Sequence, residues 1–392
     1  MKRIYISFVF ILAFFTSTAS FAQSDTTVYL ITCSPGNEVY SLWGHSALRI
    51  VINSSGYDKV YNWGVFDFDT PNFAWKFSRG RLNYKLGIYG YNAFIRDYYL
   101  EQRSVISQVV NMMPVEKLRL MVLLENNARP ENMYYRYDFL YDNCSSRIRD
   151  IFERIYGDKI IYPPDEPDRA PTFREKFNEY TRGHPWLKMG IDFLVGTPAD
   201  KKTTVRDRMF LPDDLHKILT RAIVNHNRKM IPLLQPSETI LDMPSATVGS
   251  SFFVSPIFVL SILFLLILFL SARFSHTVVI NYIDIALFLV FSVLAILMIF
   301  FNFFTDHIET RLNLNIIWFN PFIILCLVSL ARGRDDHLWF KITFFASLLY
   351  VPILVLQPDL LNPSFIPVIM ILILRSSARS GYSWNPFTTE QP

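Results

Sequence analysis

The sequence is poor in charge and in cysteine. Only 18% of its 392 residues are charged, whereas a soluble chain usually carries about a quarter. Three cysteines are too few for a disulfide framework, so the fold does not depend on one. Residues 23–245 contain 29 basic and 27 acidic side chains. Because the chain lacks the excess of positive charge that follows a phosphate backbone, we expect no nucleic-acid partner.

The N-terminus has the pattern of a secretory signal. Two basic residues precede the apolar run 4–15, and small residues follow at Ser20 and Ala22. The run is shorter than the roughly 20 residues that a membrane span needs. We therefore predict a signal peptide over 1–22, cleaved before Gln23, in preference to a first membrane anchor.

From residue 251 onwards, long apolar runs alternate with short polar breaks, and each run is close to bilayer length. The predicted spans cover 252–272, 278–301, 314–331, 339–357 and 360–375. Most of the arginines after residue 251 lie in the first, third and fifth breaks, which places those breaks in the cytoplasm by the positive-inside rule. The predicted organisation is an exported domain over 23–233, a linker over 234–250, a helical bundle over 251–375 and a cytoplasmic tail over 376–392.

Ionisable residues in the second half are candidates for function. Asp284 and Lys341 lie inside predicted spans, near their cytoplasmic ends. An intramembrane acid is a functional candidate by default, although pairing with a neighbouring cation is the simpler interpretation. The break 302–315 faces the same side as the exported domain and carries His307. His307 is a candidate substrate contact unless this break is simply a solvated loop.

The exported half reads as a mixture of strands and helices, which predicts an α+β domain. Alternating, β-branched segments indicate antiparallel strands joined by short turns. The expected strands are 27–32, 46–52, 57–66, 83–89, 103–112 and 133–139. Capping residues and periodic apolar positions indicate helices. The expected helices are about 71–78, 114–126 and 144–156.

The segment Y-D-N-C-S-S at 141–146 lies between a predicted strand and a predicted amphipathic helix. Cys144 would lie near the helix N-terminus, where unsatisfied N–H groups favour an anion. Such a site lowers the pKa of a thiol and makes it a nucleophile. Asn143 and Ser145 are candidates for holding a substrate or an oxyanion there. Alternatively, Asn143 only caps the helix and Cys144 is a buried filler, or Cys144 forms a disulfide with Cys33.

A histidine and an amide on neighbouring strands are the natural partners for this thiol. His45 opens the strand after W-G, and Asn62 lies on the next strand. A general base should sit on a rigid element, and an amide that fixes the histidine tautomer completes a Cys–His–Asn site. A lone histidine is more often structural. The combination predicts Cys144, His45 and Asn62 as the catalytic residues, with no cofactor and no metal.

The order of these residues resembles the circularly permuted papain-like fold of the lecithin:retinol acyltransferase-like branch of the NlpC/P60 superfamily. More closely, the chain resembles the bacterial Lnb-type lipoprotein N-acyltransferases, which join an exported papain-like domain to several membrane spans. The matching segments are 33–50, 61–68, 141–150, 190–200 and 210–215. The resemblance implies that Cys144 is the nucleophile and His45 its base. Asn62 stands where related acyltransferases often have a histidine.

The resemblance also implies a reaction and a location. An acyl chain would pass from a membrane phospholipid, through a cysteine thioester, to the N-terminal amine of a diacylated lipoprotein. The protein would lie in the bacterial inner membrane with its catalytic domain in the periplasm. One alternative is a membrane-tethered cysteine peptidase or amidase with the same dyad, which gives no reason for five spans. The other is a non-enzymatic envelope scaffold with a Cys33–Cys144 disulfide.

Overall fold

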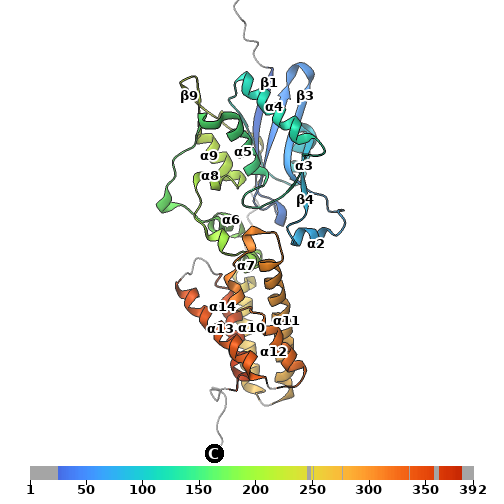
Figure 1. Ribbon diagram of the computed structural model, residues 1–392, viewed down its shortest axis with the longest axis vertical. Helices are drawn as coiled ribbons and strands as arrows, with labels where there is room; N and C mark the ends of the chain where they lie inside the picture. Colours follow the sequence, from blue (N-terminus) through green and yellow to red (C-terminus); the bar gives the residue numbers. More distant parts are fainter. Residues whose placement is uncertain are drawn as a thin grey trace, which may run out of the picture.

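The computed structural model describes residues 25–244, 249, 251–275, 277–334, 336–356 and 362–381. Figure 1 shows two parts stacked along the long axis, a sheet-and-helix part from the first half of the chain and a helical bundle from the second. The predicted signal peptide and residues 382–392 of the predicted tail lie outside the described residues.

A seven-stranded antiparallel sheet organises the first part, in the order β10-β5-β1-β2-β3-β4-β6. Its strands are β1 (Thr26–Cys33), β2 (His45–Ile52), β3 (Tyr57–Val65), β4 (Asn83–Gly90), β5 (Val105–Val109), β6 (Tyr134–Arg136) and β10 (Glu238–Leu241). The segment 234–250, predicted as a linker, contains β10, which pairs with β5. Without β10, the outer N–H and C=O groups of β5 would form an open sheet edge.

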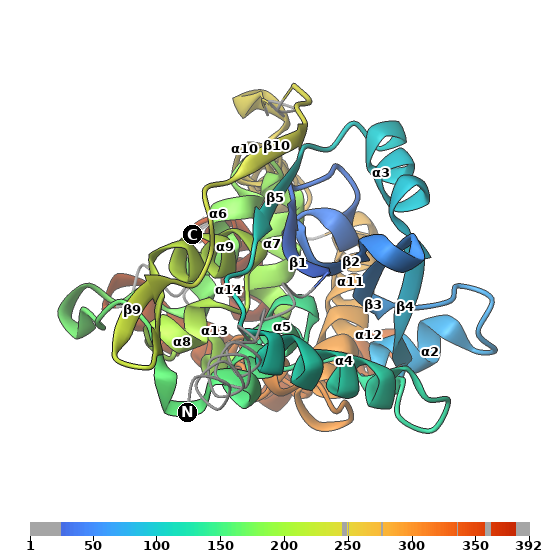
Figure 2. The same ribbon diagram turned by 90° about the horizontal axis from the view of Figure 1, so that it is seen from above.

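Helices cover both faces of the sheet (Figure 2). One face carries α4 (Pro114–Ala128) and α5 (Cys144–Tyr156), and the other carries α3 (Tyr91–Leu100). The strand period of two explains the division: Leu48 and Ile50 of β2 face the α4–α5 side, whereas Ala47 faces the α3 side. The α+β class predicted for the exported domain is therefore confirmed, and the papain-like classification stays a prediction.

Smaller elements surround this core. The helix expected from residue 71 begins two residues later, as α2 (Phe73–Ser78), because Asn72 adopts a left-handed conformation with φ of 56°. The segment after α5 adds α6 (Phe173–Thr181), α7 (Pro185–Leu194), α8 (Val205–Arg208) and α9 (Pro212–Arg221). It also holds a second sheet of β7 (Ile160–Ile161), β8 (Ile223–His226) and β9 (Lys229–Pro232).

In the described part of the second half, five helices form the bundle, and each overlaps one of the predicted spans. They are α10 (Pro256–Arg273), α11 (Val278–Phe303), α12 (Phe322–Ala331), α13 (His337–Leu356) and α14 (Phe365–Arg379). Among the described residues, three stretches are long and apolar enough to cross a membrane, namely Pro256–Arg273, Val278–Phe303 and Leu314–Ala331. The stretch His337–Ile353 is a shorter apolar helix.

Asp284 on α11 is buried and bound by two arginines of α14. Arg375 approaches one carboxylate oxygen at 2.6 Å and Arg379 approaches the other at 2.6 Å. Arg375 also donates to the hydroxyl of Ser271 on α10 at 2.8 Å. The simpler interpretation of Asp284, a structural ion pair, is confirmed. An acid in this position is tolerated inside a bundle because its charge is compensated.

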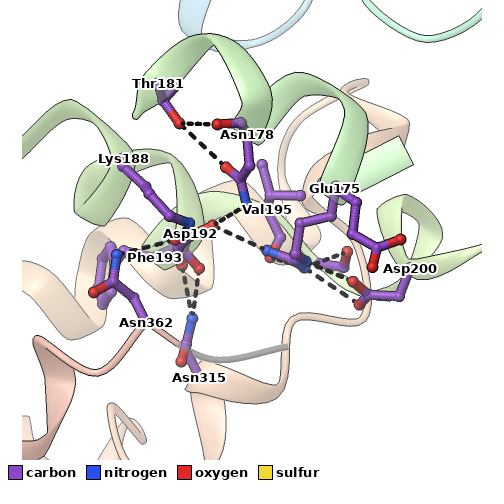
Figure 3. Close-up of polar contacts among 12 residues, drawn as sticks. Glu175, Asn178, Thr181, Lys188, Asp192, Phe193, Val195, Asp200, Asn315 and Asn362 are labelled. Carbon is purple, nitrogen blue, oxygen red and sulfur yellow. Dashed lines mark hydrogen bonds and ion pairs between the residues drawn. The ribbon is translucent and has the colours of Figure 1, made fainter. Parts of the chain in front are cut away.

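The exported domain is joined to the bundle through Asp192 on α7, whose contacts appear in Figure 3. Its carboxylate binds Lys188 at 2.7 Å and accepts a hydrogen bond from Asn362, which precedes α14, at 3.0 Å. Asn315, in the loop before α12, donates to the backbone carbonyls of Asp192 and Phe193, both at 3.1 Å. Both asparagines come from the bundle side, so polar contacts fix the domain to the bundle.

Gly196 makes this junction possible at a second point. Its N–H donates to the carbonyl of Glu309 at 2.7 Å. A Cβ atom at residue 196 would lie 1.8 Å from the carbonyl oxygen of Arg311, far inside any allowed contact. The loop between α11 and α12 therefore packs against the backbone of the exported domain, and a residue with a side chain does not fit at this position.

Candidate active site

Cys144 is the first residue of α5, and Asn143 caps that helix. The Asn143 side-chain oxygen accepts from the backbone N–H groups of Ser145 (2.9 Å) and Ser146 (3.0 Å). Its amide nitrogen donates to the carbonyls of Phe139 (2.7 Å) and Phe210 (3.0 Å). These four bonds occupy both donors and both acceptor positions of the amide. Asn143 is thus the helix cap and is not available as the substrate or oxyanion contact suggested by the sequence.

Ser145 anchors the helix to the sheet beside the thiol. Its hydroxyl lies 3.1 Å from that of Ser46 on β2 and 3.8 Å from the sulfur of Cys144. The N–H of Ser145 is already bonded to the cap. The N–H of Cys144, at the first helical position, has no acceptor within the helix. Among the groups at the start of α5, the Cys144 N–H is therefore the one left to bind an oxyanion.

His45 and Asn62 lie together, as the sequence predicts. Nε2 of His45 is 2.5 Å from the side-chain oxygen of Asn62. Because an amide oxygen only accepts, Nε2 carries the proton, and Nδ1 remains for the thiol. Gly44 sets the direction of His45: it has φ of 78°, and a Cβ there would lie 2.8 Å from the carbonyl oxygen of Cys33.

The electrostatics at Cys144 favour the thiolate. Burial alone would raise the pKa of this thiol. The charge of His45, a hydrogen bond with His45, the Ser46 N–H and the Ser145 hydroxyl outweigh burial and lower the pKa of Cys144 to about 7. A thiol with this pKa is substantially ionised near neutral pH. The structure brings Cys144, His45 and Asn62 into one interacting group.

Cys33 lies on the adjacent strand, opposite His45 in the β1–β2 pairing. It is fully buried, and both it and Cys144 are free thiols. The alternative of a Cys33–Cys144 disulfide is therefore contradicted. Burial raises the pKa of Cys33 to about 12, so this second thiol stays protonated.

His307 lies apart from this group. Its Nε2 donates to the carbonyl of Phe77, the penultimate residue of α2, at 3.0 Å. Its Nδ1 is 3.3 Å from Glu309. Burial opposes protonation of His307, but Glu309 and the Phe77 carbonyl raise its pKa above the ordinary value. His307 thus fastens the bundle loop to α2, and its described polar contacts do not include the thiol or His45.

Two family models match the chain. The model of the Lnb N-terminal periplasmic domain matches residues 13–163, and that of the Lnb transmembrane domain matches residues 248–382. The chain belongs to the Lnb family. It is therefore a membrane protein with a periplasmic N-terminal domain. No curated protein and no solved structure matches the chain.

The two Lnb models divide the site residues. Cys144, His45 and Asn62 fall within the periplasmic model, whereas His307 falls within the transmembrane model. The junction residue Asp192 lies in the segment between the two models. The described residues contain no group of three or more His, Cys, Asp or Glu side chains that could hold a metal ion.

Sequence reasoning missed two residues beside the thiol. Ser46 donates its N–H to Cys144. Burial, and to a smaller extent the charge of Cys144, raises the pKa of Tyr137. Ser46 follows the predicted base directly, so its position in the chain was a usable signal. Tyr137 lies in a segment of several tyrosines, and nothing in the sequence distinguishes it from its neighbours.

Proposed function

We propose that this protein is a lipoprotein N-acyltransferase of the inner membrane, with its C-terminus in the cytoplasm. The observation that carries the proposal is the Cys144 thiol with a pKa of about 7, beside a histidine that Asn62 orients. A nucleophile of this kind suits covalent acyl transfer. The docking of its domain on a membrane bundle suits substrates that are themselves lipids.

The first half-reaction acylates the enzyme. His45 takes the thiol proton, and the Cys144 sulfur attacks the carbonyl carbon of a phospholipid ester. The Cys144 N–H, together with the positive end of the α5 dipole, stabilises the negative oxygen of the tetrahedral intermediate. The ester C–O bond breaks, and the His45 imidazolium protonates the departing alkoxide. A thioester and a lysophospholipid result.

The second half-reaction transfers the chain. The neutral α-amine of a diacylglyceryl-cysteine attacks the thioester carbon, and His45 takes a proton from that nitrogen. The C–S bond breaks, the amide forms, and the Cys144 thiolate returns beside the imidazolium. Burial of Cys144, which is 8% exposed, keeps water from the thioester and favours the amine.

A peptidase or amidase would use the same dyad. The specific observation against it is the junction: Asn315 and Asn362 of the bundle bind α7, and Glu309 binds Gly196. A soluble peptide or peptidoglycan strand requires no such fixed height above a bilayer, whereas two membrane-anchored lipids do. Holding both lipids near one thiol raises their effective concentration.

The test uses the full chain in liposomes with a synthetic diacylated lipopeptide. We expect triacylated lipopeptide and lysophospholipid in equal amounts from the wild type, and neither from Cys144→Ser. The matched control, Cys33→Ser, should keep its activity, because Cys33 is a protonated thiol outside the reacting group. Triacylated product from Cys144→Ser would refute the nucleophile. Free fatty acid or a cleaved peptide as the main wild-type product would indicate a hydrolase.

A further inference from the structure

Large aromatic side chains lie exposed on α2 and on the segment that precedes it. Phe68, Trp75 and Phe77 are 64%, 57% and 50% exposed, respectively. They are close together: the rings of Phe68 and Phe73 are 5.1 Å apart, and those of Phe73 and Phe77 stack at 6.0 Å. An exposed aromatic cluster of this kind marks a binding surface rather than an ordinary solvent-facing one.

Two contacts place α2 at the level where the bundle leaves the membrane. The Trp75 ring lies 5.6 Å from that of Phe300, three residues before the end of α11. Beyond that end, His307 donates to the Phe77 carbonyl. In Figure 1, α2 lies at the side of the exported domain that faces the bundle. Because α11 crosses the bilayer, α2 lies at its outer interface, where tryptophan is the preferred residue.

Positive charge accompanies the aromatic rings. Lys76 lies on α2, and Arg79 follows it with its guanidinium 5.5 Å from the Trp75 ring. The Nε of Arg79 has no hydrogen-bond partner among the described residues. Aromatic rings beside cations match a phospholipid, whose chains are apolar and whose phosphate is an anion.

The aromatic surface continues inwards towards the candidate site. Phe73 is 5.9 Å from Phe66, and Phe66 is 5.2 Å from Tyr84. The next step leads from Tyr84 to Tyr137 at 4.6 Å. The ring of Tyr137 approaches Gly64, two residues after Asn62 on β3, where an added Cβ atom would lie 3.9 Å from it. We call this series of rings, Phe77, Phe73, Phe66, Tyr84 and Tyr137, the aromatic track. It runs from the membrane end of α11 to the strand that carries Asn62 in the candidate site.

We propose that the aromatic track is the entry path of the acyl donor: one acyl chain of a membrane phospholipid lies along it, so that its ester reaches Cys144. The proposal rests on the acyltransferase function. The proposal adds the route by which the donor reaches the thiol. Phe68 and Trp75 lie where the acyl chain enters, and Lys76 and Arg79 bind the phosphate. His307 acts as a positioning residue that fixes α2 to the bundle.

The kinetic test uses Phe68→Ser and Trp75→Ser in the full chain, reconstituted in liposomes. The donor phospholipid is diluted with an ether-linked phospholipid, which has no ester to transfer. We expect each substitution to raise the apparent KM for the donor about tenfold, because a large aromatic contact with the chain is lost. The KM for the lipopeptide acceptor should not change. The matched control is Leu118→Ser on α4, which removes a 65% exposed apolar side chain away from the bundle.

A second measurement separates entry from chemistry. Acylation of Cys144 by p-nitrophenyl butyrate, a soluble ester that needs no membrane route, should proceed at the wild-type rate in both variants. Loss of this reaction would mean damage to the site and would overturn the entry path. An unchanged donor KM, or a raised acceptor KM alone, would overturn it as well, the latter by assigning the track to the acceptor.

A third measurement is independent of activity. The fluorescence lost on Trp75→Phe reports on Trp75 itself, and lipids brominated on their acyl chains should quench this component in the wild type. Absence of quenching would refute the interfacial position of α2 while leaving the acyltransferase function intact. Quenching in a protein that transfers no acyl chain would refute the entry path together with that function.

Discussion

Two buried thiols of the periplasmic domain lie on either side of His45 and have opposite properties. Cys33 ends β1 in the sheet and packs with Phe94 and Tyr98 of α3. Cys144 begins α5 on the other face. Both are buried, with exposed fractions of 0% for Cys33 and 8% for Cys144. Yet the pKa of Cys33 is raised to about 12, and that of Cys144 is lowered to about 7.

The difference shows that burial does not decide which thiol reacts. Burial raises the pKa of both, because a low dielectric disfavours the charged form. For Cys33 the charge of Arg103 offsets this only in part. At Cys144 the charge of His45 and donors from His45, Ser46 and Ser145 are added, at a helix N-terminus. A reactive cysteine thus requires several donors that point at one sulfur.

The largest expected effect is in alkylation. At pH 7 a substantial fraction of Cys144 is thiolate, whereas Cys33 stays protonated because its pKa is raised to about 12. Iodoacetamide should therefore label Cys144 alone in the folded protein, with a rate that rises with pH and is half-maximal near pH 7. Peptide mass spectrometry of pH-resolved samples measures both sites. Labelling of Cys33 at a comparable rate would abolish the contrast between the two thiols.

Removing the histidine should make the two thiols more alike. In His45→Ala, burial still raises the pKa of Cys144, but the largest group that lowers it is gone, so the pKa of Cys144 should rise above 7. The kcat for N-acylation should fall by about a thousandfold because the general base is lost. The alkylation profile and liposome turnover measure the two effects. The control is His184→Ala, which removes a histidine that precedes α7 and makes no side-chain cap bond. A profile unchanged in His45→Ala would contradict the assignment of the base.

Asn62 should contribute less, because it only orients the imidazole. Asn62→Ala should lower kcat by about a hundredfold through misplacement of His45. Asn62→Asp keeps an acceptor oxygen for Nε2 and should retain at least about a tenth of the activity. Equal losses of activity in both variants would show that Asn62 does not act through its 2.5 Å hydrogen bond with His45.

The smallest effect is expected at Cys33. Cys33→Ala should leave kcat within about twofold of the wild type, since this thiol takes no part in the transfer. The cavity left by the sulfur should lower the free energy of unfolding by about 1 kcal/mol. Thermal unfolding and turnover measure both quantities. A large loss of activity in a well-folded Cys33→Ala would give Cys33 a role in the reaction.

The sheet was largely predictable from the sequence because its strands alternate between two buried faces. The helix α5 was predictable from its apolar residues at helical spacing, such as Ile148 and Phe152. The helix α3 was not predicted. Only two of its residues, Phe94 and Tyr98, are buried, so its apolar pattern is weak, and its N-cap residue Gly90 has no side chain that marks a helix start. The strand β10 was missed because edge pairing depends on β5, far away in the sequence.

For the candidate site, local signals pointed to Cys144, His45 and Asn62, which the structure brings together, but not to their surroundings. Cys144, His45 and Asn62 each follow from a short motif, and the family resemblance joined them. The role of Asn143 depended on two carbonyls, one of them from Phe210, 67 residues away. The contacts of Asn315 and Asn362 with Asp192 span 123 and 170 residues. No local pattern encodes contacts at such separations.

The ion pair between Asp284 and the arginines of α14 has a consequence for biosynthesis. Asp284 enters the membrane with the second helix, but Arg375 is 91 residues further along the chain. Until the last helix is made and inserted, the growing bundle contains an acid without its two partners. A chain that ended before α14 would keep Asp284 buried without either arginine. The helix α14 is therefore needed to compensate the buried charge of Asp284.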